Sequence, residues 1–173
     1  MTNNFKVVLT KNLTYALIIF GLYIIQATPG LLSVWGVKPL LALPAALCIA
    51  MLEDDLQGGL MGAFAGLLCD TTSFTAFGFH AILFLLLCTT AAFLVMFAIQ
   101  VNLTSVLWVC AAAMFIRSSV EYFFFYFIWG YEGASSLYLT KILPNVIWSC
   151  LWVPLIFACI RRVKAWFDRR MDV

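Results

Sequence analysis

Long apolar runs alternate with short polar breaks along this chain. Four of the runs, residues 13–35, 79–99, 103–129 and 142–160, are each long enough to cross a bilayer as a helix. A transmembrane helix needs about 20 mostly apolar residues, and lipid offers no hydrogen-bond partner to an open backbone. The pattern therefore predicts an all-α protein that is embedded in a membrane.

Two shorter apolar segments, 39–52 and 58–69, flank an acidic turn made of Glu53, Asp54 and Asp55. A helix of 14 residues covers only about 21 Å of a hydrocarbon core about 30 Å thick. These segments are either two short spans or one re-entrant hairpin, sheltered by their neighbours. Either alternative predicts a polytopic bundle of about six transmembrane helices, forming a single domain over residues 1–173.

The basic residues gather at the two ends of the chain and predict its orientation. Lys6 and Lys11 come before the first span, and a cluster comes after the last: Arg161, Arg162, Lys164, Arg169 and Arg170. The positive-inside rule places both termini in the cytoplasm. The opposite loops carry only Lys38 and Lys141, and an outer aromatic belt is expected at Trp35, Trp129, Tyr131 and Tyr138.

Composition excludes several classes of function. The chain is 65% hydrophobic and 10% charged, and its net charge of +2 gives no basic face for nucleic acid. The six cysteines stand singly in apolar runs, so we expect small core residues rather than metal ligands. The sequence has no serine nucleophile elbow, HExxH, glycine-rich phosphate loop or paired intramembrane aspartates. We therefore expect no catalytic residues, no cofactor and no metal.

Glycines at every fourth position form a ridge on the third segment. Gly58, Gly62 and Gly66 share one helix face, with Phe64 beside them. Small residues at this spacing let another helix approach closely. The ridge serves either packing inside the protein's own bundle or docking of another membrane protein, so these four residues are a candidate partner-packing face.

A few polar residues lie within the apolar segments. Arg117 and Glu121 stand one helical turn apart in the fifth segment, and an arginine at that depth costs at least about 2.5 kcal/mol unless it is paired. Asp70 ends the third segment, where we expect it to cap or pin the outer loop, and His80 opens the fourth. Asp70, Arg117 and Glu121 form a candidate buried polar cluster. Its alternatives are a structural ion pair, a ligand counter-ion, a proton relay and a contact with a partner helix. Gln26 predicts a kink or a polar contact between helices.

One ordered set of features resembles a known family. A proline-led second segment is followed by Gly62-Ala63-Phe64-Ala65-Gly66-Leu67-Leu68-Cys69-Asp70, by Gly78 eight positions later, and by Pro154-Leu155 with the basic run Arg161-Arg162-Val163-Lys164. This set resembles MreD, the rod shape-determining membrane protein family of bacteria. Length and the order of apolar segments match over nearly the whole chain. Phe64 departs from the family pattern, since it stands two residues before Gly66 instead of three, and the turn at Glu53 is unusually acidic.

The resemblance implies a non-enzymatic scaffold in the bacterial inner membrane that takes part in cell elongation. Its implied partners are the bitopic protein MreC, a peptidoglycan glycosyltransferase and transpeptidase pair, and the actin-like MreB filament. The MreD family also resembles the substrate-binding subunits of energy-coupling-factor vitamin transporters. A small-molecule binding subunit is therefore the alternative, and it would need polar groups that converge in a pocket. The candidates for such a pocket are Asp70, Thr71, Thr72, His80, Arg117 and Glu121.

Overall fold

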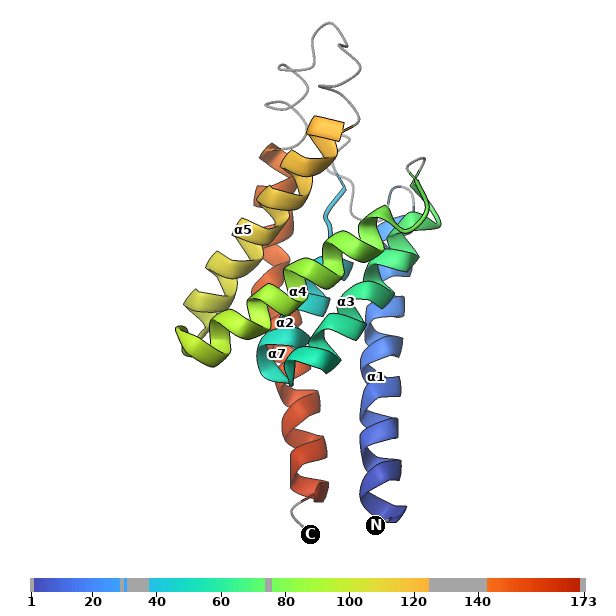
Figure 1. The fold of residues 1–173 in the computed structure, drawn as a ribbon, viewed down its shortest axis with the longest axis vertical. Helices are drawn as coiled ribbons and strands as arrows, with labels where there is room; N and C mark the ends of the chain where they lie inside the picture. The colour runs from blue at the N-terminus through green and yellow to red at the C-terminus, as the bar shows by residue number, and fades with distance from the viewer. Residues whose placement is uncertain (1, 29, 31–37, 74–75, 125–142, 172–173) are drawn as a thin grey trace, which may run out of the picture.

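The computed structural model describes residues 2–28, 30, 38–73, 76–124 and 143–171. These residues form six helices and no strand, which confirms the all-α prediction (Figure 1). The helices are α1 (Thr2–Ala27), α2 (Ala42–Leu52), α3 (Asp55–Asp70), α4 (Phe79–Phe97), α5 (Leu103–Tyr122) and α7 (Leu143–Met171).

Four of the helices contain stretches long and apolar enough to cross a membrane, namely Val7–Ala27, Phe79–Phe97, Leu103–Tyr122 and Pro144–Arg169. The chain is thus a helical membrane bundle. Both termini lie at the same end of it (Figure 1). The expected aromatic belt residues Trp35, Trp129, Tyr131 and Tyr138 lie outside the described residues, as does Lys141.

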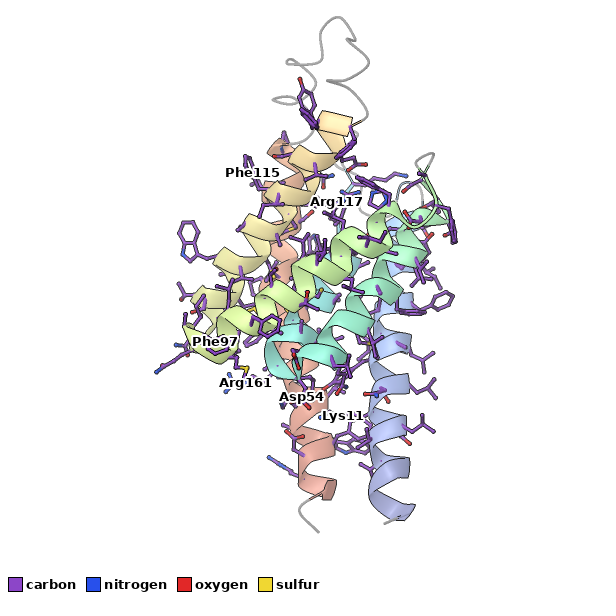
Figure 2. The ribbon with its side chains drawn as sticks, in the orientation of Figure 1. Lys11, Asp54, Phe97, Phe115, Arg117 and Arg161 are labelled. Carbon is purple, nitrogen blue, oxygen red and sulfur yellow. The ribbon has the colours of Figure 1, made fainter. Side chains whose placement is uncertain are left out.

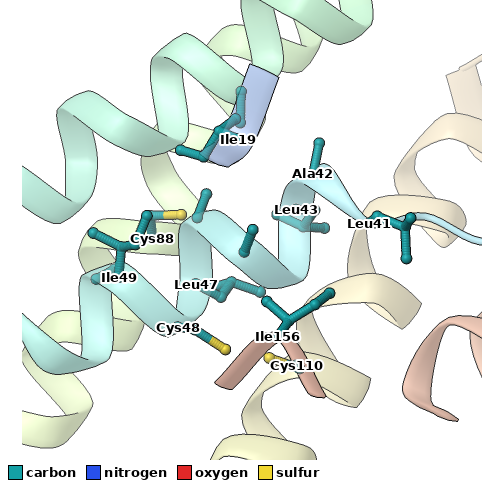
Figure 3. Packing of buried hydrophobic residues seen from close by; sticks show 14 of the residues in the cluster. Ile19, Leu41, Ala42, Leu43, Leu47, Cys48, Ile49, Cys88, Cys110 and Ile156 are labelled. Carbon is teal, nitrogen blue, oxygen red and sulfur yellow. The ribbon is translucent and has the colours of Figure 1, made fainter. Parts of the chain in front are cut away.

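The short helix α2 lies at the centre of the bundle. It has 11 residues, and all of them from Ala42 to Met51 are buried. Figure 3 shows it among side chains from four other helices, including Ile19 of α1, Cys88 of α4 and Ile156 of α7. At about 1.5 Å per residue α2 is far shorter than a bilayer core, so it is a helix sheltered by protein rather than a lipid-exposed span.

Side chains from other helices cap the start of α2. The Gln26 side-chain oxygen on α1 accepts the backbone N–H groups of Leu41, at 2.8 Å, and Ala42, at 3.1 Å. The Ser149 hydroxyl on α7 accepts the N–H of Leu40 at 2.7 Å and donates to the carbonyl of Asn145 at 2.7 Å. The first N–H groups of a helix have no partner within it, so these bonds satisfy donors that lie inside the bundle. Gln26 makes the polar contact that its position predicted.

An ion-pair cluster joins three elements at the end of α2. Glu53 lies 2.8 Å from the Lys11 ammonium of α1, 2.8 Å from the Tyr15 hydroxyl and 3.7 Å from the Lys164 ammonium of α7. Lys11 is only 5% exposed and also lies 3.5 Å from Asp168. Buried charges of this kind are tolerated because each has a partner. The cluster ties the α2–α3 turn to the two terminal helices.

The glycine ridge is occupied by the protein's own helices. A Cβ atom on Gly58 would lie 2.5 Å from the Ala50 Cα of α2, and one on Gly62 would lie 2.7 Å from the Phe84 carbonyl oxygen of α4. A Cβ on Gly66 would overlap the carbonyl oxygen of His80. The ridge therefore serves internal packing, which is the first of the two alternatives given above.

The candidate partner-packing face is corrected accordingly. Gly58, Gly62 and Gly66 are buried, and Phe64 is half-buried against the core. A partner helix cannot reach glycines that α2 and α4 already contact. The lipid-facing side of α3 instead carries three exposed leucines, Leu56, Leu60 and Leu67.

We predict that Gly66→Ala destabilises the bundle by about 1–3 kcal/mol or more, because the added methyl group forces α3 away from α4. Gly21→Ala on α1 is the matched control, since nothing lies within 4 Å of that position. It should leave stability unchanged or raise it by up to about 1 kcal/mol. Thermal unfolding of both variants in detergent measures the difference, and equal stability would contradict the close contact between α3 and α4.

Candidate functional site

Asp70 at the end of α3 holds the start of α4. Its carboxylate accepts the backbone N–H groups of Gly78 at 2.9 Å, His80 at 3.1 Å and Ala81 at 3.3 Å. The carboxylate also lies 2.7 Å from Nδ1 of the His80 ring. A negative charge at a helix N-terminus is favoured both by the unpaired N–H groups and by the helix dipole. Asp70 thus pins the loop between the two helices, as predicted.

Gly78 gives a structural reason for the spacing in the Asp70…Gly78 motif. It precedes α4 with a φ of +95°, in the left-handed region that favours glycine. With this backbone turn, the N–H groups of residues 78, 80 and 81 point to one carboxylate. The motif therefore encodes a helix hairpin in which an aspartate caps the following helix across a glycine turn.

His80 extends the contact from Asp70 to α5. Its ring is fully buried, and Nε2 lies 3.2 Å from Nη2 of Arg117. A guanidinium can only donate, so Nε2 accepts, and Nδ1 carries the hydrogen that His80 donates to Asp70. Arg117 also pairs with Glu121 at 3.1 Å, and Glu121 lies 3.8 Å from Nε2 of His80. Asp70, His80, Arg117 and Glu121 form one continuous series of contacts from α3 to α5, here called the polar chain.

The structure brings together the three residues of the candidate buried polar cluster, Asp70, Arg117 and Glu121. It does so through His80, which the sequence analysis did not include in that cluster. A signal for His80 exists in the sequence. Asp70 and His80 flank the same loop, and residues on either side of a tight helix hairpin face one another. Arg117 and Glu121 pair directly, as their spacing predicts.

A cavity of about 360 Å³ lies beside the polar chain. It is at the end of the bundle where Figure 2 shows Arg117, opposite Lys11 and the chain termini. Its walls come from α1, the segment before α2, the loop after α3, α5 and α7. The residues are Tyr23, Gln26, Ala27, Lys38, Pro39, Leu40, Thr72, Arg117, Glu121 and Asn145. Three of the six expected pocket residues, Thr72, Arg117 and Glu121, line this cavity, whereas Asp70, Thr71 and His80 do not.

Arg117 keeps one donor without a partner among the described residues, its buried Nε. An unsatisfied buried donor costs about 1–3 kcal/mol. Arg117 also lines a smaller space of about 10 Å³, whose other polar residues are Ser118, Asn145 and Ser149. That smaller space has the size and polar walls for a single buried water. A water there, or a polar group in the large cavity, would satisfy Nε.

Four of the six cysteines belong to the core, while Cys150 is half-buried and Cys159 is exposed. All six are free, and Cys48, Cys69, Cys88 and Cys110 are buried. They behave as the small apolar residues that the sequence predicts. In the part of the chain that the structure describes, no three histidine, cysteine or acidic side chains gather as a metal site would require.

Fold and site together define the class of this protein. It is a helical membrane bundle with a short buried helix at its centre and a polar chain that links three helices. No family model matches the chain, and comparison with curated proteins and with solved structures found no similar protein.

We predict that Asp70→Asn lowers the free energy of unfolding by about 2–3 kcal/mol, because an amide cannot accept all four hydrogen bonds and carries no charge. Asp54→Asn is the control. Asp54 is exposed and makes no side-chain capping bond, so its loss should change stability by less than about 0.5 kcal/mol. Denaturant titration of both variants gives the comparison, and a neutral Asp70→Asn would remove the capping role.

A double-mutant cycle tests the pairing inside the polar chain. Arg117→Ala leaves the Glu121 carboxylate without its partner, so the single variant should be less stable than the wild type. Adding Glu121→Ala should recover part of the loss, with a coupling energy of about 0.5–3 kcal/mol. A double variant that is no more stable than Arg117→Ala would argue against direct pairing.

Proposed function

We propose that this protein is a non-enzymatic membrane scaffold of the bacterial cell-elongation machinery, similar to MreD. In this proposal it resides in the inner membrane with both termini in the cytoplasm. It links a bitopic partner of the MreC type to the peptidoglycan glycosyltransferase and transpeptidase, and to the MreB filament. The proposal rests on the motif around Asp70 and on one groove in the membrane-facing surface.

The groove lies between α4 and α5. Figure 1 shows these consecutive helices meeting at their connecting loop and diverging from it. The space between them has a volume of about 310 Å³ and an almost wholly apolar lining. Its residues are Leu87, Thr90, Ala91, Leu94, Trp108, Val109, Ala112, Ala113 and Ile116. Since this surface faces lipid, the groove is open to a helix from another protein.

The shape of the groove suits a single transmembrane helix. Ala91, Ala112 and Ala113 contribute small side chains, and Trp108 at its edge is 74% exposed. Helices associate in lipid chiefly through close packing, which small residues permit. A bitopic partner supplies one such helix and needs no reactive group in return. This groove is the observation that favours the scaffold.

The cavity beside the polar chain supports a second candidate, a small-molecule binding subunit of the energy-coupling-factor type. Lys38 and Arg117 offer positive charge to that space, and Glu121 offers negative charge. A few polar groups that converge in a cavity of this size are typical of ligand sites. It ranks second because Arg117 already pairs with Glu121 and donates to His80.

We predict that Ala112→Trp, which fills the groove, reduces co-purification of the MreC-type partner by about tenfold or more, since a loss of about 1.4 kcal/mol is tenfold in affinity. Ala112 is exposed, so the bundle itself should fold. Gly21→Trp is the matched control, because Gly21 has nothing within 4 Å and lies on α1. Native mass spectrometry of the protein, gently extracted from a rod-shaped host, measures the partner.

The same experiment separates the two functions. Wild-type protein that carries a bitopic elongation protein and a wall synthase supports the scaffold. Wild-type protein that carries a vitamin-sized molecule together with ATPase subunits supports the binding subunit instead. A partner retained equally by both tryptophan variants would show that the α4–α5 groove is not its docking site.

A further inference from the structure

Lys164 and the arginines that precede it on α7 differ in their contacts. Lys164 turns inward, where it pairs with Glu53 and donates to the carbonyl of Leu52. Arg161 and Arg162 are exposed and make no ion pair or hydrogen bond with any residue that the structure describes. Two guanidinium groups are therefore available to a partner from outside the chain.

Both arginines border a groove between α5 and α7. This groove, here called the α5–α7 groove, has a volume of about 430 Å³. Its apolar walls are Leu103, at the start of α5, and Pro154, Phe157 and Ala158 of α7. Arg161 and Arg162 lie at one end, followed by Ala165. The groove is thus apolar along its length and strongly positive at one end.

The sequence pattern predicts that the positive end lies at a membrane boundary. The last apolar run stops at Ile160, directly before the arginines, and α5 starts at Leu103 after the polar residues Gln100 and Asn102. Figure 2 shows Arg161 near the level of Asp54, toward the end of the bundle that holds the termini and away from Arg117. The apolar walls inside the membrane match the acyl chains of a phospholipid, and the positive charge at the membrane edge matches an anionic headgroup.

We propose that the α5–α7 groove binds one anionic phospholipid, with an acyl chain along Leu103 and Phe157 and the phosphate on Arg161 and Arg162. Guanidinium groups bind phosphate oxygens through paired N–H donors. Basic pockets between transmembrane helices on the cytoplasmic side are favoured sites for anionic headgroups. The lipid would be compatible with either function proposed above.

No acidic group among the described residues, including Asp54 and Asp55 of the α2–α3 turn, forms an ion pair with Arg161 or Arg162. Asp168, on the next turns of α7, lies 3.5 Å from Lys11. Glu53 is surrounded by Lys11, Tyr15 and Lys164. The charge of the two arginines is therefore available to the phosphate.

Native mass spectrometry of the full chain in a neutral detergent tests the proposal. The protein is titrated with phosphatidylglycerol and with phosphatidylcholine of the same acyl chains, and phosphatidylglycerol should bind more tightly. The double variant Arg161→Gln/Arg162→Gln should lose phosphatidylglycerol affinity by about tenfold to thirtyfold, given the usual contribution of two basic residues at an anionic surface. Its phosphatidylcholine affinity should not change.

Arg169→Gln is the matched control, because Arg169 is an exposed arginine of the same helix that does not line the groove. It should bind phosphatidylglycerol as the wild type does. The double variant Arg161→Lys/Arg162→Lys keeps both positive charges and should retain most of the preference for phosphatidylglycerol. That result would show that the glutamine variant loses binding because it loses charge, and not because it misfolds. Ala158→Trp keeps both arginines but fills the apolar part, and it should also weaken binding.

Three outcomes would overturn the proposal. The first is a wild type with no preference for phosphatidylglycerol, and the second is a folded double glutamine variant that keeps the preference. The third is glycerol phosphate competing as well as the whole lipid, since the acyl chain would then contribute nothing.

Discussion

Backbone N–H groups that lie away from water must find an acceptor, and this constraint organises the whole bundle. Helices α2 and α4 both begin next to other helices. Neither has an N-cap residue whose side chain bonds the first N–H groups of the helix. α2 receives its acceptors from Gln26 of α1 and Ser149 of α7, and α4 receives Asp70 from α3. Each cap therefore also joins helices that are separate in the sequence, and helix formation and helix packing depend on the same few side chains.

The two charged clusters follow the same logic at opposite ends. Glu53 at one end and the polar chain at the other each draw residues from three elements. Removing one member leaves a buried charge without a partner. This costs far more stability than replacing the whole pair with apolar residues. Such clusters add fixed polar contacts to the close packing that associates helices in lipid. In this bundle, polar contacts help to fix how the helices are arranged, and apolar side chains fill the space between them.

The long spans could be predicted from the sequence because lipid imposes a length of about 20 apolar residues on any isolated helix. The start of α2 was less clear, since the apolar segment begins at residue 39 while the helix starts at Ala42, where the Gln26 cap falls. The pair Arg117 and Glu121 was predictable from a spacing of four within one helix. The contacts Lys11–Glu53 and Leu40–Ser149 were not, because the partners are separated by 42 and 109 positions and no local pattern links them.

The position of α2 also constrains the order in which this protein can be completed. α2 is too short to be stable in lipid by itself, and part of its shelter comes from α7, the final helix of the chain. Until α7 has been synthesised, Leu40 lacks Ser149 and Glu53 lacks Lys164. The central helix therefore lacks part of its shelter until α7 is in place. An intermediate that lacks α7 has incomplete packing at its centre, and such species are prone to misassembly.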